Sequence, residues 1–262
     1  MMIKNILASI IEVELSSDKY VRKPYPAALH GLCYFLAGED YPHKKFMPPF
    51  FHPFIKNWNS GKWGTKAIIQ ITCMENELTE RMLNSLESLH DIRLGHGNLL
   101  IERFSLIKQE FIPLDSEQIA PVPNEFKIEF VTPTRFRTFK VDRYITKAYP
   151  DLRLFIRSAS RQLHILYGLE IGLEEQEKLI QGIEIIHVVG YPVQVKIDAK
   201  APYDDSFIGE MHLVCTKLSE KYKRLFGLLL KTTKYFGIGH KKGYGNGHIK
   251  IKKPRENFGY GG

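Results

Sequence analysis

The sequence predicts an α+β protein made of two tandem ferredoxin-like units, each with the order strand, helix, strand, strand, helix, strand (βαββαβ, RRM-like). Three observations support this prediction. Strand-like and helix-like hydrophobic periods alternate along the chain, the same order returns in its second half, and a proline-containing stretch, 113–123, separates the two runs. The units expected from this division are residues 1–115 and 123–262.

The first unit is expected to open with a strand, because residues 1–15 are apolar and rich in β-branched side chains. Apolar residues at helical spacing predict a helix over 25–38, which Gly38 can close. The next stretch, 39–57, is rich in Pro, His and Phe and is expected to be irregular. The remaining predicted elements of this unit are a strand at 66–73, a helix over 78–89 and a strand at 99–110.

The second unit repeats the order. Its predicted elements are a strand at 125–131, a helix at 151–167, a hairpin of 183–189 and 191–197, a strand at 207–215, a helix after Ser219 and a strand at 247–251. Gly190 is the predicted turn of the hairpin, and Ser219 is the predicted N-cap. The helix at 151–167 is expected to bury Leu152, Phe155, Ile156, Ala159 and Leu163.

Composition favours a polyanionic partner. The chain has 262 residues, of which 44% are apolar, and its formal charge is +8. Such a charge suits RNA, DNA or an anionic membrane surface. Cys33, Cys73 and Cys215 lack metal-ligand or redox spacing and are expected to be buried thiols in a reducing compartment. No apolar run is long enough to span a bilayer, and no signal-peptide pattern opens the chain, so we expect a cytoplasmic protein without a membrane partner.

A glycine-rich run near the carboxyl end, 237–247, is the first candidate site. Glycine permits positive φ and close backbone approach, so such a loop can form an anion-binding concavity from its N–H groups. The candidate phosphate-binding residues here are Gly237, Gly239, His240, Lys241, Lys242 and Gly245. The alternative is a tight helix-to-strand turn with a purely structural role.

A basic stretch between 135 and 161 is the second candidate. It contains Arg135, Arg137, Lys140, Arg143, Arg153, Arg157 and Arg161. The last three recur every four residues and therefore form one stripe on a helix. The aromatic residues Phe136, Phe139 and Tyr144 lie between the basic ones and could stack on unpaired bases. The alternative is a solvated helix face.

Three segments together resemble a known family. They are Gly237-x-Gly239-x-Lys241-x-x-x-Gly245-x-Gly247, the segment Phe207-Ile208-Gly209 before it, and Phe130-Val131-Thr132-Pro133-Thr134-Arg135-Phe136. The combination resembles the CRISPR-associated endoribonucleases of the RAMP superfamily, which cut precursor CRISPR RNA. This resemblance implies two ferredoxin-like domains and RNA cleavage without a metal or other cofactor. It also implies binding of the RNA product, with interference-complex subunits or a second copy of the chain as further partners.

The resemblance also implies a catalytic histidine in or just after the first helix. His43 is the best match, because a Pro-Phe pair follows it closely, and His30 and His52 are rivals. Imidazole titrates near neutral pH and can act as acid or base. Lys44, Lys45 or Lys56 could stabilise charge on the phosphate, and Tyr25 or Tyr34 could orient the reacting groups. The expected reaction is attack by the RNA 2′-hydroxyl, which leaves a 2′,3′-cyclic phosphate and a 5′-hydroxyl.

Two alternative functions fit the same residues. One is a non-catalytic RAMP subunit that holds CRISPR RNA in an interference complex, and the other is a general basic RNA-binding protein. Cleavage of repeat RNA in a chelator separates the enzyme from both.

Overall fold

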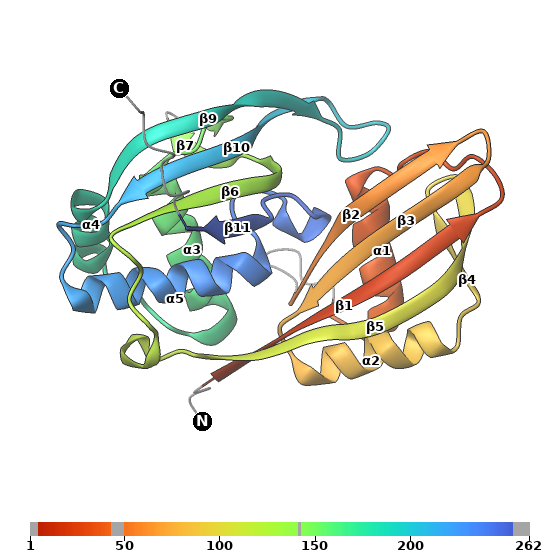
Figure 1. The fold of residues 1–262 in the computed structure, drawn as a ribbon, viewed down its shortest axis with the longest axis horizontal. Coiled ribbons are helices and arrows are strands. Elements are labelled where there is room, and N and C mark those ends of the chain that lie inside the picture. The colour runs from red at the N-terminus through yellow and green to blue at the C-terminus, as the bar shows by residue number, and fades with distance from the viewer. Residues whose placement is uncertain (1–4, 43–49, 141–142, 254–262) are drawn as a thin grey trace, which may run out of the picture.

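The computed structural model describes residues 5–42, 50–140 and 143–253, and it shows two antiparallel sheets with helices beside each (Figure 1). A separate two-stranded hairpin completes the fold. The predicted α+β class and the tandem ferredoxin-like arrangement are confirmed.

The first unit contains a five-stranded sheet in the order β2-β3-β1-β5-β4. Its elements are β1 (Asn5–Ser17), α1 (Pro26–Ala37), β2 (Phe51–Gly61), β3 (Gly64–Cys73), α2 (Asn76–Glu87), β4 (Asp91–Leu94) and β5 (Gly97–Pro113). Alternate residues of β1, such as Ile11, Val13 and Leu15, are buried in one cluster with Leu32 of α1 and Met82 of α2. Both helices therefore cover the same face of this sheet.

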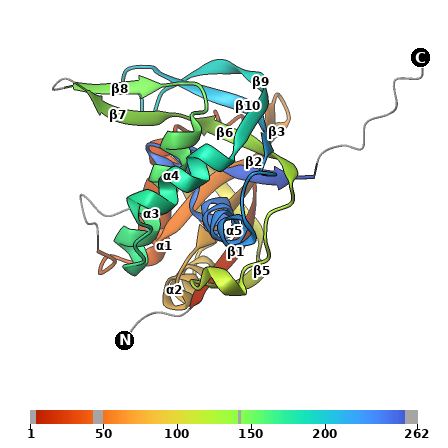
Figure 2. The ribbon, with the colours of Figure 1, turned by 90° about the vertical axis from the view of Figure 1, so that its left-hand side faces the viewer.

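The second unit has a four-stranded sheet in the order β11-β6-β10-β9. Its elements are β6 (Glu125–Thr134), β7 (Phe136–Lys140), β8 (Arg143–Lys147), α3 (Leu152–Tyr167), α4 (Leu173–Gly182), β9 (Glu184–Val195), β10 (Asp204–Val214), α5 (Glu220–Phe236) and β11 (Ile249–Lys252). All five residues predicted to face inward from α3 are buried. The β7–β8 hairpin is inserted between the first strand and the first helix, and it extends away from the helices (Figure 2).

The two units share a hydrophobic core. Ile6, Ala8 and Ile112 of the first sheet belong to the same buried cluster as Phe226 and Leu229 of α5. Between the units lie the turn Ser116–Gln118 (η1) and its flanking residues, where the sequence predicts a linker. Because one apolar cluster crosses this junction, the residues that meet between the units are held in fixed register.

The hairpin predicted at Gly190 is wrong. β9 runs unbroken through Gly190 and pairs along its length with β10. Gly190 lies opposite Gly209, and a Cβ at position 190 would overlap the carbonyl oxygen of Ile208. The glycine therefore allows a close approach of two strands, and it does not mark a turn.

The sequence prediction also missed several elements. β2 begins inside the stretch expected to be irregular, and β4, α4 and the β7–β8 hairpin were not predicted. β2 contains Pro53, which lowers its strand signal, but β2 is an edge strand and an edge tolerates proline.

Candidate functional site

The glycine-rich run connects α5 to β11 and has a backbone that needs glycine. Gly237, Gly239, Gly245 and Gly247 have φ between 73° and 88°. A Cβ at Gly247 would overlap the carbonyl oxygen of Ile238, so this position also needs glycine for space. The predicted positive φ values are thus present.

Hydrogen bonds hold this loop onto the end of β6. Ile238 N–H donates to Gly247 O over 2.9 Å, and Gly247 N–H donates to Pro133 O over 3.1 Å. His240 N–H donates to Arg135 O over 2.9 Å. Because these amides already donate to carbonyls of the protein, they hold the loop rigid. Contacts with other groups are therefore left to the side chains of the loop.

The loop meets the first unit at His30 of α1. His30 Nδ1 lies 2.9 Å from Gly243 O, and its ring stacks on Tyr244 at 4.2 Å between centroids. A carbonyl can only accept, so Nδ1 carries a proton. The Gly243 carbonyl therefore sets the orientation of the imidazole.

Aromatic residues surround His30. The rings of Tyr34 and His30 meet edge to face at 4.9 Å, and Tyr41 lies 5.7 Å from Tyr34. Burial raises the pKa of both phenols, which stay protonated donors at neutral pH. Tyr41 Oη accepts a hydrogen bond from Phe50 N–H at 3.3 Å. His43 and Lys45 lie outside the described residues.

His52, the third candidate histidine, is fully buried. Its Nε2 lies 3.0 Å from Asn246 O, and a Cβ at Gly237 would lie 2.6 Å from the same nitrogen. Burial lowers the pKa of His52 to about 4. Beyond it, His248 stacks on Phe54 at 3.9 Å. The imidazole of His52 is a neutral packing residue between the two units.

Cations cluster on the side of the loop nearest β7. Arg135 is only 3% exposed and forms an ion pair with Asp204, to which Lys241 Nζ also lies close at 3.6 Å. Burial, and then Arg135, Arg137 and Lys241, lower the pKa of His240 to about 4. Arg135, Arg137 and Lys241 thus lie near the carboxylates of Asp204 and Asp198, and this group of cations suits a phosphate.

Lys242 has a different environment from its neighbour Lys241. Its Nζ donates to Oε1 of Gln162 on α3. Burial, with Arg161 nearby, lowers the pKa of Lys242 to about 7. Lys242 therefore fastens the loop to α3, and its charge changes near neutral pH.

The arginine stripe lies on the exposed side of α3, as the spacing predicts. Arg153 and Arg157 are exposed, but both reach Glu177 of α4, at 2.6 and 3.5 Å. Arg161 continues the stripe toward Lys242. Phe136 is buried and does not offer a stacking surface. The side chains of Phe139, Lys140, Arg143 and Tyr144 lie outside the described part.

Within the described residues, no group of three or more His, Cys, Asp and Glu side chains could hold a metal ion. Among the helices of that part of the chain, none has the length and apolar character to cross a bilayer.

Comparison with known families gives a match within the second unit. Residues 128–249 match the family model of the CRISPR-associated endoribonuclease Cas6. This match covers the glycine-rich run and the two segments that suggested the family from the sequence. The match agrees with the family of endoribonucleases that the sequence resembles. Comparison with curated protein sequences gives no match.

Solved structures extend the likeness to nearly the whole chain. A Cas6 product complex is 19% identical with a TM-score of 0.75, covering 94% of this chain and 100% of that one. Thermus thermophilus Cas6 is 19% identical with a TM-score of 0.68, covering 94% and 98%. An RAMP protein binding different RNA substrates is 13% identical with a TM-score of 0.61, covering 94% and 100%. At these identities the likeness establishes the fold.

Proposed function

We propose that this chain cuts the repeat segment of precursor CRISPR RNA and keeps hold of the guide RNA that results. The observation that carries the proposal is the contact of His30 with the glycine-rich loop. It brings an imidazole from the first unit against a loop of the second unit that is flanked by cations. The Cas6 family pattern in the second unit supports the substrate class.

The RNA strand is proposed to follow the exposed cations. They run from the α3 stripe, ending at Arg161, to Lys241 and Arg137 beside the loop. Arg135 is buried under this surface and supports it through Asp204. Binding through phosphates should weaken with salt, with a log–log slope of about −0.7 for each phosphate neutralised on a single strand.

Cleavage is proposed to take place beside His30 and Tyr34, where the chain segment with His43 and Lys45 begins and ends. A base removes the proton from the 2′-hydroxyl, and the oxygen attacks the adjacent phosphorus. The bond from phosphorus to the 5′-oxygen breaks, and an acid protonates the leaving oxygen. His43 is the proposed acid or base, Lys45 the proposed partner of the charged phosphate, and His30 and Tyr34 the proposed groups that orient the ribose.

The test is incubation of the purified chain with the repeat RNA of its source genome in EDTA. The proposal predicts one cut, with a 2′,3′-cyclic phosphate or 3′-phosphate on one product and a 5′-hydroxyl on the other. Tight binding of the repeat without any cut would instead support the non-catalytic subunit. Binding without preference for the repeat would support a general RNA-binding protein. Size-exclusion chromatography with light scattering would show whether two copies pair.

A further inference from the structure

The short turn Lys242–Tyr244 (η2) in the glycine-rich loop contacts His30 through two groups. Its Gly243 carbonyl accepts a hydrogen bond from His30 Nδ1 over 2.9 Å, and its Tyr244 ring stacks on the imidazole. Such bonds have an ordinary range of about 2.7–3.2 Å, so a shift of η2 by a fraction of an ångström takes this bond out of that range. The position of η2 therefore sets the orientation of His30.

The loop backbone just before η2 is strained. Among the described residues, Lys241 is the only one other than glycine with a positive φ, 60°. Left-handed backbone is unfavourable for a residue with a Cβ and persists only where neighbouring contacts maintain it. On the amino side of Lys241, His240 N–H donates to Arg135 O over 2.9 Å. On its carboxyl side, η2 packs on α1 and β2 of the first unit, and the side chain of Lys242 reaches the second unit.

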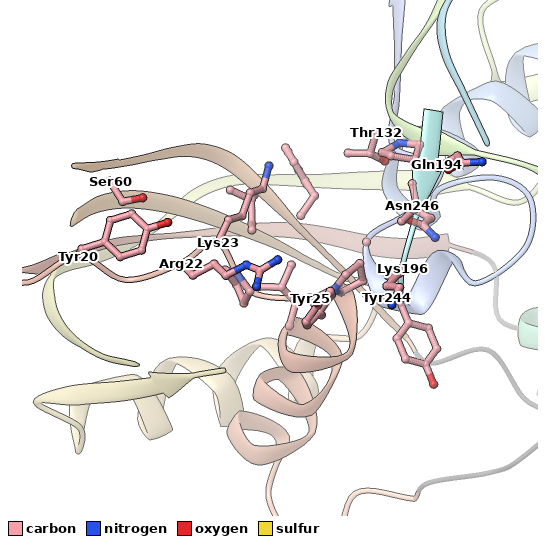
Figure 3. Close-up of a pocket in the computed structure, with 18 residues that line it drawn as sticks. Tyr20, Arg22, Lys23, Tyr25, Ser60, Thr132, Gln194, Lys196, Tyr244 and Asn246 are labelled. Atoms are coloured by element: carbon pink, nitrogen blue, oxygen red, sulfur yellow. The ribbon is translucent and has the colours of Figure 1, made fainter. Parts of the chain in front are cut away.

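An open groove beside η2 limits its packing (Figure 3). The groove has a volume of about 500 Å³ and is lined by Tyr25 before α1, Thr132 of β6 and the loop residues Tyr244 and Asn246, among others. Residues that border open space have fewer packing contacts than residues in a filled interior. On this side packing therefore does little to hold η2, and the turn depends on the polar contact of Lys242.

That contact is a hydrogen bond between the loop and α3. Lys242 Nζ donates to Gln162 Oε1, and Gln162 is only 4% exposed. Burial and Arg161 lower the pKa of Lys242 to about 7, and no carboxylate of the described residues offsets them, so this amine relies on Gln162 as its acceptor. α3 buries Phe155 and Leu163 in the core, which fixes the acceptor in space.

Stability alone does not account for a glutamine at position 162. Within the described part of the chain, Gln162 Nε2 is buried and has no hydrogen-bond partner. A buried donor without a partner destabilises the folded state, and apolar side chains in place of both Gln162 and Lys242 would avoid that cost. The glutamine is suited instead to the role of its other end, where Oε1 accepts from Lys242.

We infer that Gln162 is a positioning residue for His30. Gln162 holds Lys242, Lys242 holds η2, and the Gly243 carbonyl of η2 holds the imidazole. The inference rests on the proposed function, which puts the ribose of the RNA beside His30. It gives α3 of the second unit a role in orienting a group on α1 of the first unit. Gln162 needs no contact with the RNA for this role.

The test breaks the hydrogen bond with Gln162→Met. Methionine is close to glutamine in length and volume, so it removes the acceptor without opening a cavity. Gln162→Glu keeps an acceptor oxygen and should behave like the wild type. Gln181→Met, at an exposed glutamine of α4, is the matched control. Lys242→Met breaks the same bond from its other end and serves if Gln162→Met does not fold, which urea unfolding of each variant checks.

The first measurement is the ¹⁵N NMR spectrum of the imidazoles in the free protein, at about pH 8, where an ordinary imidazole is neutral. The His30 signals are assigned by their loss in His30→Gln. In the wild type, Nδ1 of His30 carries a proton. Gln162→Met should shift both ring nitrogens of His30 toward the values of the opposite tautomer, because the Gly243 carbonyl is no longer held against Nδ1. Gln162→Glu and Gln181→Met should leave these signals unchanged.

The second measurement is single-turnover cleavage of repeat RNA with protein in excess. Gln162→Met should lower the rate roughly 10- to 100-fold, because a displacement of about 1 Å at a reacting site has an effect of that order. The dissociation constant of the RNA should stay within about twofold of the wild-type value, since Gln162 acts only through η2. Gln162→Glu should recover the rate.

Unchanged His30 signals in a folded variant that lacks the hydrogen bond would overturn the inference. A cleavage rate that Gln162→Glu does not restore would also overturn it. The NMR spectra need no RNA. Shifted His30 signals in a protein that leaves the repeat uncut would therefore contradict the proposed function alone.

Discussion

Two histidines of the first unit contact the same glycine-rich loop and have opposite characters. His30 is half-buried, stacks on Tyr244 and lies against Gly243 O, whereas His52 is fully buried and lies against Asn246 O. Burial keeps the imidazole of His52 neutral down to a pKa of about 4. His52 therefore packs between the two units, whereas the chemistry is proposed to take place beside His30. We call the His52 side of the loop the packing side and the His30 side the chemical side.

The largest expected effect is on the chemical side. His43→Ala should lower the single-turnover rate of repeat RNA cleavage by roughly 10²–10⁴ with RNA affinity nearly unchanged, because a proton-transfer group is removed. Quenched time courses on end-labelled RNA measure it. His96→Ala, in the exposed turn before β5, is the matched control and should keep the wild-type rate. Wild-type turnover in His43→Ala would move the role to His30.

A substitution in the glycine-rich loop tests the packing side. Gly247→Ala should lower the free energy of unfolding by about 2–4 kcal/mol, because its Cβ would overlap Ile238 O at a positive φ. Gly31→Ala is the control, since nothing lies within 4 Å of a Cβ built there in the middle of α1. It should stabilise the protein by about 0.5–1 kcal/mol. Chemical denaturation of both variants measures the difference, and equal stabilities would show that the loop tolerates side chains.

The pH dependence of stability is a further test of the comparison between His30 and His52. The folded pKa of His52, about 4, lies below the unfolded value of 6.5, so the unfolded state binds more protons at intermediate pH. Its contribution is complete above pH 6.5 and is lost as pH falls toward 4, by on the order of 3 kcal/mol. Urea unfolding between pH 7 and 4.5 measures this loss. His52→Gln keeps a donor for Asn246 O and should flatten the curve, and an unchanged slope in that variant would assign the acid sensitivity elsewhere.

The smallest effects concern the cations. Lys241→Ala with Lys242→Ala should weaken RNA binding and reduce the slope of log affinity against log salt by about 0.7 for each phosphate that the variant no longer neutralises. Lys242 also holds α3 through Gln162, so the single variant Lys241→Ala separates charge from structure. Anisotropy titrations at several salt concentrations measure the slopes. Unaltered affinity in both variants would make the loop purely structural.

The sequence predicted the parts that local periodicity controls. The apolar spacing of α3 correctly predicted five of its eight buried residues, and the glycine spacing of 237–247 predicted positive φ values. It could not predict contacts between distant segments. The packing of Asn246 on His52, the burial of Arg135 under the loop and the junction of His30 with Tyr244 all depend on how the two units meet. Pro53 weakened the strand signal of the edge strand β2, and Gly190 made the unbroken strand β9 resemble a hairpin.

A groove between the two units, lined by Tyr25 and Lys196 among others, could not be predicted from the sequence either. Its walls come from segments far apart in the sequence, so neither segment alone carries a recognisable motif. The His43 and Lys45 assignments remain predictions from the resemblance, because these residues lie outside the described part of the chain.

One measurement tests the central claim most directly. The repeat RNA is prepared with a single 2′-deoxyribose immediately before the cleaved phosphate and is compared with all-ribose RNA in EDTA. If the strand's own hydroxyl attacks its backbone beside His30, the deoxy RNA will bind with unchanged affinity and will not be cut. Cleavage of the deoxy RNA at the same phosphate would contradict the account.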